Sequence, residues 1–428
     1  MSPTRGKHVF YGWWIVAAAF LNLFFAVGIV FYGFPVFYPS LVESLGFTRA
    51  QLTQGFFHGF LLVGLPCGLL AGAIIDRIGA RWVILAGAML IGASLVLMGK
   101  ISKLWHYEAL CILEVTGYVL AGPIANQVLV ARWFRQRRGR AMGYAYLGLG
   151  LGGAVSPLLV NHLIAHYGWR SAIEIVGMLI AGVLVPVGIW VTRSDPAELG
   201  LQPDGAEAAD PCQSAGQTAG AQSVGTAVRS LNFSLILVGS TLAIGAIGAV
   251  IQHFVLFLKD QGYAAAVAAR FFAAVQLASL GGRVIVGYVA DRFSKAKTMA
   301  LFYFLIGLSV LLLSAAHQPG AIWAFVMLFG FAMGADYMLI PLVTAESFGT
   351  AALGKILALI ITGYSLGQWG APLLAGRIFD AQHSYDLAWK LLGAAGILSA
   401  AAIYAIRRDT RMAGTPLRSA PKTSRPGL

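Results

Sequence analysis

Charged residues are scarce in this chain of 428 residues, since only 11% are charged and 58% are hydrophobic. A soluble globular chain carries about 25% charged residues, so the composition excludes an ordinary water-soluble enzyme. Apolar runs of about 18 or more residues recur from end to end, which is the signature of membrane-spanning helices. We therefore predict an all-α membrane protein that crosses a lipid bilayer many times.

Cysteine is also rare, and the chain shows none of the motifs that catalysis would need. Cys67, Cys111 and Cys212 have neither the spacing of a metal site nor that of a disulfide framework. The sequence shows no nucleotide-binding loop, metal cluster or nucleophile triad. We therefore expect no enzymatic activity, no metal and no cofactor.

The net charge of +13 raises the possibility of a nucleic-acid partner, but the placement of the charges argues against it. With the N-terminus inside, 21 of the 30 lysines and arginines fall on the inner side, 8 on the outer side and Arg283 within a span. Such an excess of positive charge marks the cytoplasmic side of a membrane protein. We predict cytoplasmic termini, a bilayer partner and no nucleic acid. The first apolar run is too long for a signal-peptide core, so we expect it to be retained as a helix.

The apolar runs define twelve expected spans. They are 10–37, 53–75, 82–101, 105–131, 139–164, 171–192, 231–258, 265–290, 297–316, 319–345, 352–378 and 386–406. The spans predict a six-helix bundle over 1–192, a cytoplasmic linker over 193–230 and a second six-helix bundle over 231–406. The polar, Gly-, Ala- and Ser-rich linker is typical of mobile chain. The basic tail, 407–428, should be disordered against the anionic inner leaflet.

The two halves are internal repeats related by a constant offset of 215 residues. The offset pairs 56–57 with 271–272, 72–77 with 287–292, and 139–159 with 354–374, where Gly, Pro, Asp and Arg recur at matching positions. Parallel repeats related by an axis along the membrane normal are typical of transporters that rock two bundles about a central site. The repeats predict pseudo-symmetric bundles.

A repeated motif lies at the inner ends of two helix pairs. It contains Asp76, Arg77 and Arg81 in the first half and Asp291 and Arg292 in the second. The first copy resembles the G-x-x-x-D-R-x-G-R-[KR] signature of the major facilitator superfamily, although Ala80 and Trp82 depart from it. We interpret these five residues as a conformational latch that holds the outward-open state. A solvated loop with positive-inside arginines is the alternative.

Further motifs resemble the monocarboxylate transporter family within that superfamily, and some of them its bacterial members. The likeness lies in 11–14 (YGWW), 132–143 (RWFRQRRGRAMG), 252–262 and 348–380, and so extends along nearly the whole chain. The resemblance implies a major facilitator fold and transport of a small carboxylate.

Arg283 is the most informative single residue. It lies eight residues before Asp291, about 12 Å along a helix, so its charge cannot easily reach the inner surface. An arginine within a membrane suggests a functional site, and its guanidinium suits a carboxylate. The monocarboxylate transporters also hold their substrate-binding arginine at the matching position. A structural ion pair with Asp336 is the alternative.

The proton-handling residues of eukaryotic monocarboxylate transporters are absent here. Ser279 replaces the aspartate one turn before the arginine, and Tyr32 stands in a helix that lacks their lysine. If transport is coupled to protons, the candidate carriers are Asp336 and His253. Glu114 is a weaker candidate that we expect at a solvated helix end.

Polar side chains can complete a central cavity around Arg283. Tyr118 and Asn126 share one helix face at a spacing of eight residues. The repeat places Tyr337 opposite that face, and Tyr32 and Tyr364 can add hydroxyl groups at a similar depth. Packing against a neighbouring helix is the alternative for each tyrosine.

These observations predict a monomeric secondary transporter of the plasma membrane, specifically a bacterial inner membrane. We expect it to move a small organic monocarboxylate, lactate- or pyruvate-like, by alternating access with a proton. An organic-anion antiporter of the oxalate/formate type is one alternative. A non-transporting membrane sensor is another, although the linker sequence offers no folded domain for it.

Overall fold

The computed structural model describes residues 10–204, 224–314, 319–348 and 353–406, and these residues are almost entirely helical. The predicted tail, half of the predicted linker and four residues at each of two turns lie outside the described residues.

The first half contains nine α-helices and short π- and 3₁₀-helical turns within the described chain. In chain order these are α1 (Gly12–Asn22), η1 (Leu23–Ile29), α2 (Val30–Gly33), η2 (Phe34–Phe37), α3 (Tyr38–Leu45), α4 (Arg49–Gly59), η3 (Phe60–Gly64), α5 (Leu65–Ile78), α6 (Ala80–Met98), α7 (Leu104–Ala121), α8 (Pro123–Trp133), α9 (Arg138–Pro186), η4 (Val187–Val191) and η5 (Pro196–Leu199).

The second half is more regular. Its helices are α10 (Val224–Val228), α11 (Leu231–Asp260), α12 (Ala265–Arg292), α13 (Lys295–Ser314), α14 (Pro319–Phe348), α15 (Leu353–Gln382) and α16 (Asp386–Tyr404).

Helices run through each of the twelve predicted spans as far as these are described. Nine helices among the described residues are long and apolar enough to cross a membrane, or ten if a bent pair in α14 is one span. One of the nine contains two predicted spans, because α9 continues past a break at Gly168. Gly168 has φ 73°, a left-handed conformation that glycine adopts without steric cost. The chain therefore turns back at this residue.

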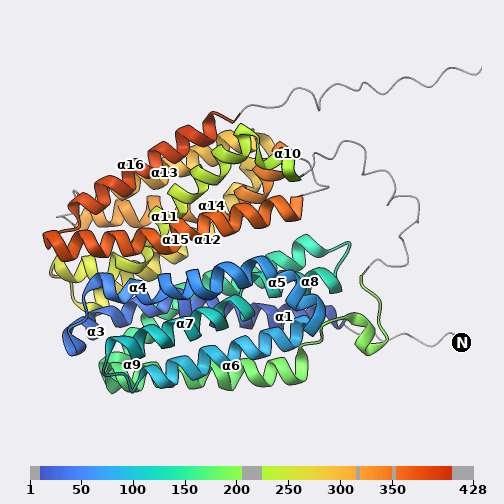
Figure 1. The fold of residues 1–428 in the computed structure, drawn as a ribbon, viewed down its shortest axis with the longest axis horizontal. Coiled ribbons are helices and arrows are strands. Elements are labelled where there is room, and N and C mark those ends of the chain that lie inside the picture. The colour runs from blue at the N-terminus through green and yellow to red at the C-terminus, as the bar shows by residue number, and fades with distance from the viewer. Residues whose placement is uncertain (1–9, 205–223, 315–318, 349–352, 407–428) are drawn as a thin grey trace, which may run out of the picture.

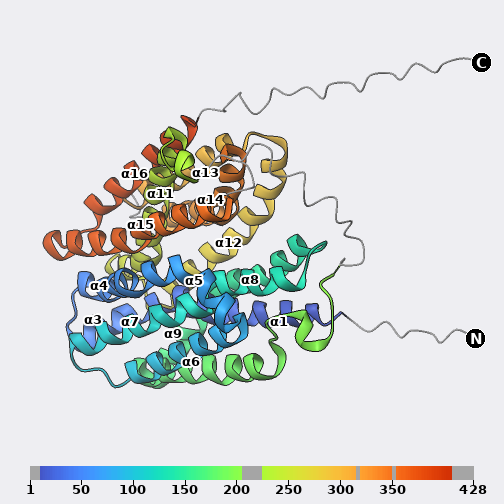
Figure 2. The same ribbon diagram turned by 45° about the vertical axis from the view of Figure 1, so that its right-hand side comes forward.

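The helices form two bundles, one from each half of the chain (Figure 1), and the two remain separate when the view is turned (Figure 2). Equivalent helices pack in the same way in both. In the first half α9 packs on α1 and η1, α6 on α7 and α9, and α4 on α7; in the second half α15 packs on α11, α13 on α14 and α16, and α12 on α14. The internal repeat of the sequence is thus a repeat of the packing.

Glycines permit the closest of these helix contacts. A Cβ atom on Gly148 or Gly152 would clash with backbone atoms of the first span, and one on Gly367 would clash with the backbone of α11. Gly152 and Gly367 are related by the 215-residue offset. Small residues let helix backbones approach in a membrane, where no hydrophobic driving force acts between helices.

The two bundles meet chiefly along two helix pairs, α9 with α12 and α4 with α15. We call the end of the molecule where α1 begins and α16 ends the terminal end, and the opposite end, where α3 turns into α4, the far end. The turn between α3 and α4 is determined by residues within the turn itself. Gly46 ends α3 with φ 66°, and Thr48 and Gln51 form a reciprocal capping box at the start of α4.

The first residues of the predicted linker pack on the first bundle. Trp133 Nε1 donates to the Arg193 carbonyl at 2.9 Å, and the Asp204 carboxylate accepts from the backbone of Arg135 and Arg137. A linker mobile along its whole length was therefore the wrong expectation for the part that ends at Asp204. Its polar side chains cap backbone groups that the predicted spans leave free.

Candidate functional site

Arg283 lies on α12 at the contact between the two bundles, opposite the glycine-rich part of α9. A Cβ atom on Gly150 would lie 3.0 Å from Arg283 Nη1, so the glycine provides the space that the guanidinium occupies. No hydrogen bond or salt bridge connects Arg283 with another residue of the described chain. The alternative of an ion pair with Asp336 is therefore absent from this conformation.

Two tyrosines lie near this arginine, and two more lie near those tyrosines. The phenols of Tyr32 and Tyr146 are within electrostatic range of Arg283. Tyr118 is within electrostatic range of Tyr32 and Tyr146. Tyr364 is within the same range of Tyr118 and Tyr146. The structure thus brings three of the predicted tyrosines together and adds Tyr146. No separate sequence pattern indicated Tyr146, because it stands in a glycine-rich segment that also has a packing explanation.

Gln276 is a second addition to the predicted site. It lies two helical turns before Arg283 on the same face of α12. The residue is fully buried, and neither atom of its side-chain amide has a hydrogen-bond partner. A Cβ atom on Gly153 would lie 3.2 Å from Gln276 Oε1 and 2.9 Å from Tyr32 Cδ2. A buried amide without partners is costly unless something else bonds to it, so Gln276 is a candidate ligand contact.

Asp336 lies on α14 on the other side of Tyr32. It is 4% exposed, and its Oδ1 accepts a hydrogen bond of 2.8 Å from the Tyr303 hydroxyl. The carboxylate lines a cavity between the bundles, together with Phe31 and Tyr32 of the first half and Gln368 of the second. Arg283 and Asp336 thus both interact with Tyr32 without forming an ion pair.

His253 and Asn126 lie apart from the Arg283 cluster. The ring nitrogens of His253 on α11 are bonded to the Tyr385 hydroxyl and the Pro372 carbonyl, each at 2.9 Å. Asn126 donates to the carbonyls of Ala121 and Gly122, where α7 breaks into α8. Asn22 also donates to Ala121 O, so both amides stabilise this break.

Only part of the predicted latch is described. The side chains of Asp76, Asp291 and Tyr337 lie outside the described residues. Arg77 and Arg292 are exposed at the terminal end.

Arg81, the remaining latch residue, donates to the carbonyls of Gly188 and Ile189, at 3.1 and 2.6 Å, within the first bundle. The described latch residues therefore make no bond between the bundles in this conformation.

The bundles are instead bonded together at the far end, through Arg49 at the start of α4. Its guanidinium donates to both Asp260 oxygens, at 2.5 and 2.6 Å, and to the Tyr385 hydroxyl at 2.8 Å. The Asp380 carboxylate accepts from the backbone of Arg49 and Ala50, at 3.0 and 2.9 Å. We call Arg49, Asp260, Asp380 and Tyr385 the far-end clamp. The sequence signal was present, because each is a polar residue beside a predicted span, but nothing in the sequence paired them.

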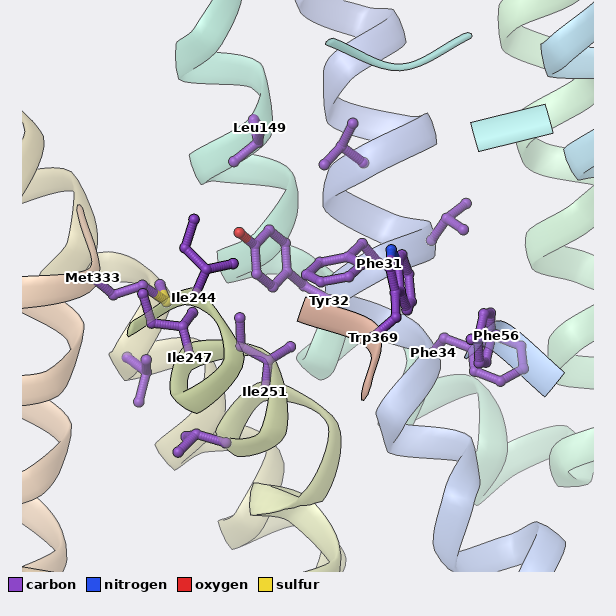
Figure 3. Packing of buried hydrophobic residues seen from close by; sticks show 14 of the residues in the cluster. Phe31, Tyr32, Phe34, Phe56, Leu149, Ile244, Ile247, Ile251, Met333 and Trp369 are labelled. Atoms are coloured by element: carbon purple, nitrogen blue, oxygen red, sulfur yellow. The ribbon is translucent and has the colours of Figure 1, made fainter. Parts of the chain in front are cut away.

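An aromatic layer separates the far-end clamp from Arg283. Trp369 of α15 stacks on Phe56 at 5.9 Å between ring centroids and meets Phe31 edge-on at 5.6 Å. In Figure 3 Phe31 and Trp369 lie beside each other, next to Tyr32, between helices of the two halves. This layer and the clamp close the path between the bundles at the far end.

Glu114 is not at a solvated helix end, and that expectation was wrong. The residue is 1% exposed on α7, and neither carboxylate oxygen has a hydrogen-bond partner. It lines a cavity under the aromatic layer with Phe31, Tyr118 and Gln252. Because α7 begins at Leu104, Glu114 lies almost three turns inside the helix.

Comparison with known proteins agrees with this arrangement. The family model described as Major Facilitator Superfamily matches residues 19–368 and 276–426. Among curated proteins, monocarboxylate transporter 13 of Bos taurus is 27% identical over 390 residues, covering 90% of this chain and 86% of the relative. Monocarboxylate transporter 12 of Homo sapiens is 25% identical over 450 residues, covering 100% of this chain and 86% of the relative.

Solved structures show the same fold at low identity. A variant of the nucleoside transporter NupG has a TM-score of 0.73 at 11% identity, covering 92% of this chain and 99% of that one. A bacterial homologue of the lysosomal transporter Spinster, in an inward-facing and occupied conformation, has a TM-score of 0.65 at 14% identity, covering 93% and 96%. The predicted all-α membrane fold of two six-helix bundles is confirmed.

Proposed function

Since this chain belongs to the Major Facilitator Superfamily, we propose that it is a secondary active transporter that moves a small organic monocarboxylate together with a proton. The observation that carries the proposal is the guanidinium of Arg283, which lies near tyrosines between the two bundles and has no hydrogen-bonded or ion-paired partner among the described residues. Lactate and pyruvate represent the expected size and chemistry. The names of the curated relatives support the carboxylate class.

The chemistry of the site suits a hydroxy- or oxo-acid. Arg283 can bind a carboxylate through two parallel hydrogen bonds. Tyr32, Tyr146 and Gln276 can bond to the remaining oxygen atoms of such a substrate. Closing the bundles around Arg283 buries its charge further, and burying a cation without a partner is costly. Substrate binding to Arg283 would therefore lower the free energy of this closure. Loading of the site would thereby permit the conformational change.

The conformation supports alternating access. With both termini in the cytoplasm, the far end is the outer end, and the far-end clamp closes the outer path. The Arg283 cluster would then communicate with the inside, and the Asp76, Arg77, Arg81, Asp291 and Arg292 motif would hold the opposite, outward-open state. We further propose that the first bundle ends at 192, that the linker ends at 230 and that the second bundle ends at 406. We also propose that the protein is a monomer in a bacterial inner membrane. The likeness to bacterial monocarboxylate transporters stays a prediction, since the relatives named above are mammalian.

Uptake by the purified full-length protein in proteoliposomes tests the proposal. Radiolabelled L-lactate or pyruvate should enter saturably, and an inward proton gradient should produce accumulation. An absence of saturable binding and uptake of every small monocarboxylate tested would contradict the substrate class. Exchange that is insensitive to a pH gradient would instead favour the antiporter of the oxalate/formate type. The single described cation in the cluster weighs against a dicarboxylate, which would need a second fixed positive charge.

A further inference from the structure

We propose that Glu114 is the residue that binds the transported proton. The inference rests on the proposed proton-coupled function and assigns its coupling site. Glu114 comes from α7 of the first bundle and lines a cavity whose other wall includes Gln252 and Trp369 of the second. The cavity therefore lies at the surface along which the two bundles must separate when the far end opens.

The surroundings of Glu114 require its neutral form in this conformation. The carboxyl group is 1% exposed and has no hydrogen-bond donor for either oxygen. An ionised carboxylate with neither a cation nor a donor is far more costly to bury than a protonated one.

The nearby titratable side chains offer no compensation, because all are uncharged at neutral pH. From α3 and α7 these are Tyr38, Tyr107, Cys111 and Tyr118. Gln252, the polar group facing the cavity from α11, has its Oε1 occupied by the Tyr38 hydroxyl at 2.6 Å. No charged residue of the described chain interacts with Glu114 from the other helices packed on α7.

Asp336 is in a different environment. It accepts a hydrogen bond from Tyr303, and it interacts with Tyr32, which also interacts with the Arg283 cation. An ionised Asp336 therefore has a hydrogen-bond donor, which Glu114 lacks among the described residues. This carboxylate can remain charged while the far end is closed, whereas Glu114 cannot.

Both ring nitrogens of His253 are hydrogen-bonded, in a chain of bonds that leads to the far-end clamp. A carbonyl can only accept, so His253 Nε2 donates to Pro372 O and Nδ1 accepts from the Tyr385 hydroxyl. That hydroxyl accepts in turn from Arg49. A second proton on His253 would break this chain and place a positive charge near the Arg49 guanidinium. The clamp thus holds His253 neutral and makes it a structural residue.

These contacts define a coupling cycle. When the far end is open, the Glu114 carboxylate takes a proton from the outer solution, and the neutral acid can then be buried. After closure the proton leaves through the cavity past Tyr118, which lies one helical turn further along α7 and interacts with Tyr32. The remaining unpartnered carboxylate destabilises the closed far end and favours its reopening.

Two transport modes in proteoliposomes separate this assignment from the proposed function. We expect Glu114→Gln to lose proton-driven accumulation of labelled L-lactate or pyruvate down to the level without a gradient, because it mimics the protonated acid permanently. Exchange of labelled for unlabelled substrate at equal pH on both sides should stay within about threefold of the unsubstituted protein, since it needs no net proton movement. Glu108→Gln is the matched control. Glu108 lies on the same helix with 25% of its side chain exposed and accepts a bond from Gln54, so both modes should persist.

Failure of the Glu114 assignment and failure of the proposed substrate give different results. Proton-driven accumulation retained in Glu114→Gln, or lost instead in Asp336→Asn with exchange intact, overturns the assignment to Glu114. A protein that neither takes up nor exchanges these acids contradicts the proposed substrate and leaves the proton site to be tested by infrared spectroscopy. There, the protonated-carboxyl C=O band of the full-length protein should be lost in Glu114→Gln. If that variant does not fold, Glu114→Asp should shift this band. An unchanged band in either variant overturns the assignment.

Discussion

Two arginines at the contact between the bundles differ in what surrounds them. Arg49 is bonded to Asp260 and Tyr385, and its guanidinium lies 3.5 Å from the centroid of the Phe379 ring. Arg283 has no bonded partner in the described chain. A fully paired buried cation holds two surfaces together, whereas an unpaired one needs a ligand. On the proposed function, the comparison distinguishes Arg49, which closes the far end, from Arg283, which we propose binds the substrate.

Removal of Arg283 should have the largest effect. Arg283→Ala should lower lactate or pyruvate uptake by on the order of 100-fold or more, because the substrate carboxylate loses its charged partner. Arg283→Lys should recover part of that loss, since it keeps the charge without the bidentate geometry. Radiolabelled uptake measures both.

The exposed Arg270, on the same helix, provides the control for this comparison. Arg270→Ala should transport normally. Equal loss in Arg270→Ala, or full uptake in Arg283→Ala, would remove the distinction between a binding arginine and a structural one.

Opening of the far-end clamp should have the next largest effect. Arg49→Ala removes hydrogen bonds to a charged partner, each worth about 1.5–3 kcal/mol, and should shift the protein toward the state with an open far end. Hydrogen–deuterium exchange should then accelerate at the start of α4 and the end of α15, with less change in Arg49→Lys. Unaltered exchange there would mean that the aromatic layer alone keeps this end closed.

Substitution of Gln276 should affect binding more than folding. Gln276→Leu removes a buried amide that has no hydrogen-bond partner among the described residues, so the melting temperature of the variant should stay the same or rise. If the amide bonds to the substrate, KM should increase about tenfold, corresponding to about 1.4 kcal/mol, with little change in the maximal rate. A lower melting temperature with unchanged KM would instead assign Gln276 to helix packing.

The ion pair between Lys259 and Glu43 should have the smallest effect. It spans the bundles at 2.7 Å, but the two side chains are 32% and 66% exposed. Exposed pairs contribute about 0–1 kcal/mol, so Lys259→Ala should reduce uptake by less than about fivefold and leave the far-end exchange rate nearly unchanged. A loss as large as that of Arg49→Ala would show that the clamp extends to the rim.

The helices and the repeat could be predicted because each depends on local pattern. Apolar runs marked all twelve segments, and the 215-residue offset marked the equivalent helices. The break at Gly168 was expected between the spans 139–164 and 171–192. The π-helical turns were not predicted, since they depend on how neighbouring helices pack. At the site, Arg283 was conspicuous because a charge within an apolar run is rare. Gln276 and Tyr146 were not conspicuous in the sequence, because uncharged polar residues are common in transmembrane helices.

The sequence by itself determined that this chain spans a membrane as two repeated bundles with one arginine deep between them, because hydropathy and charge placement act along the chain. Tertiary structure alone decided which charges are paired. Arg49 meets Asp260 and Tyr385 across more than 200 and 300 residues of sequence respectively, while Glu114 meets no partner. The free energy of a buried charge depends on the donors and acceptors within a few ångströms, and only the folded chain brings these together.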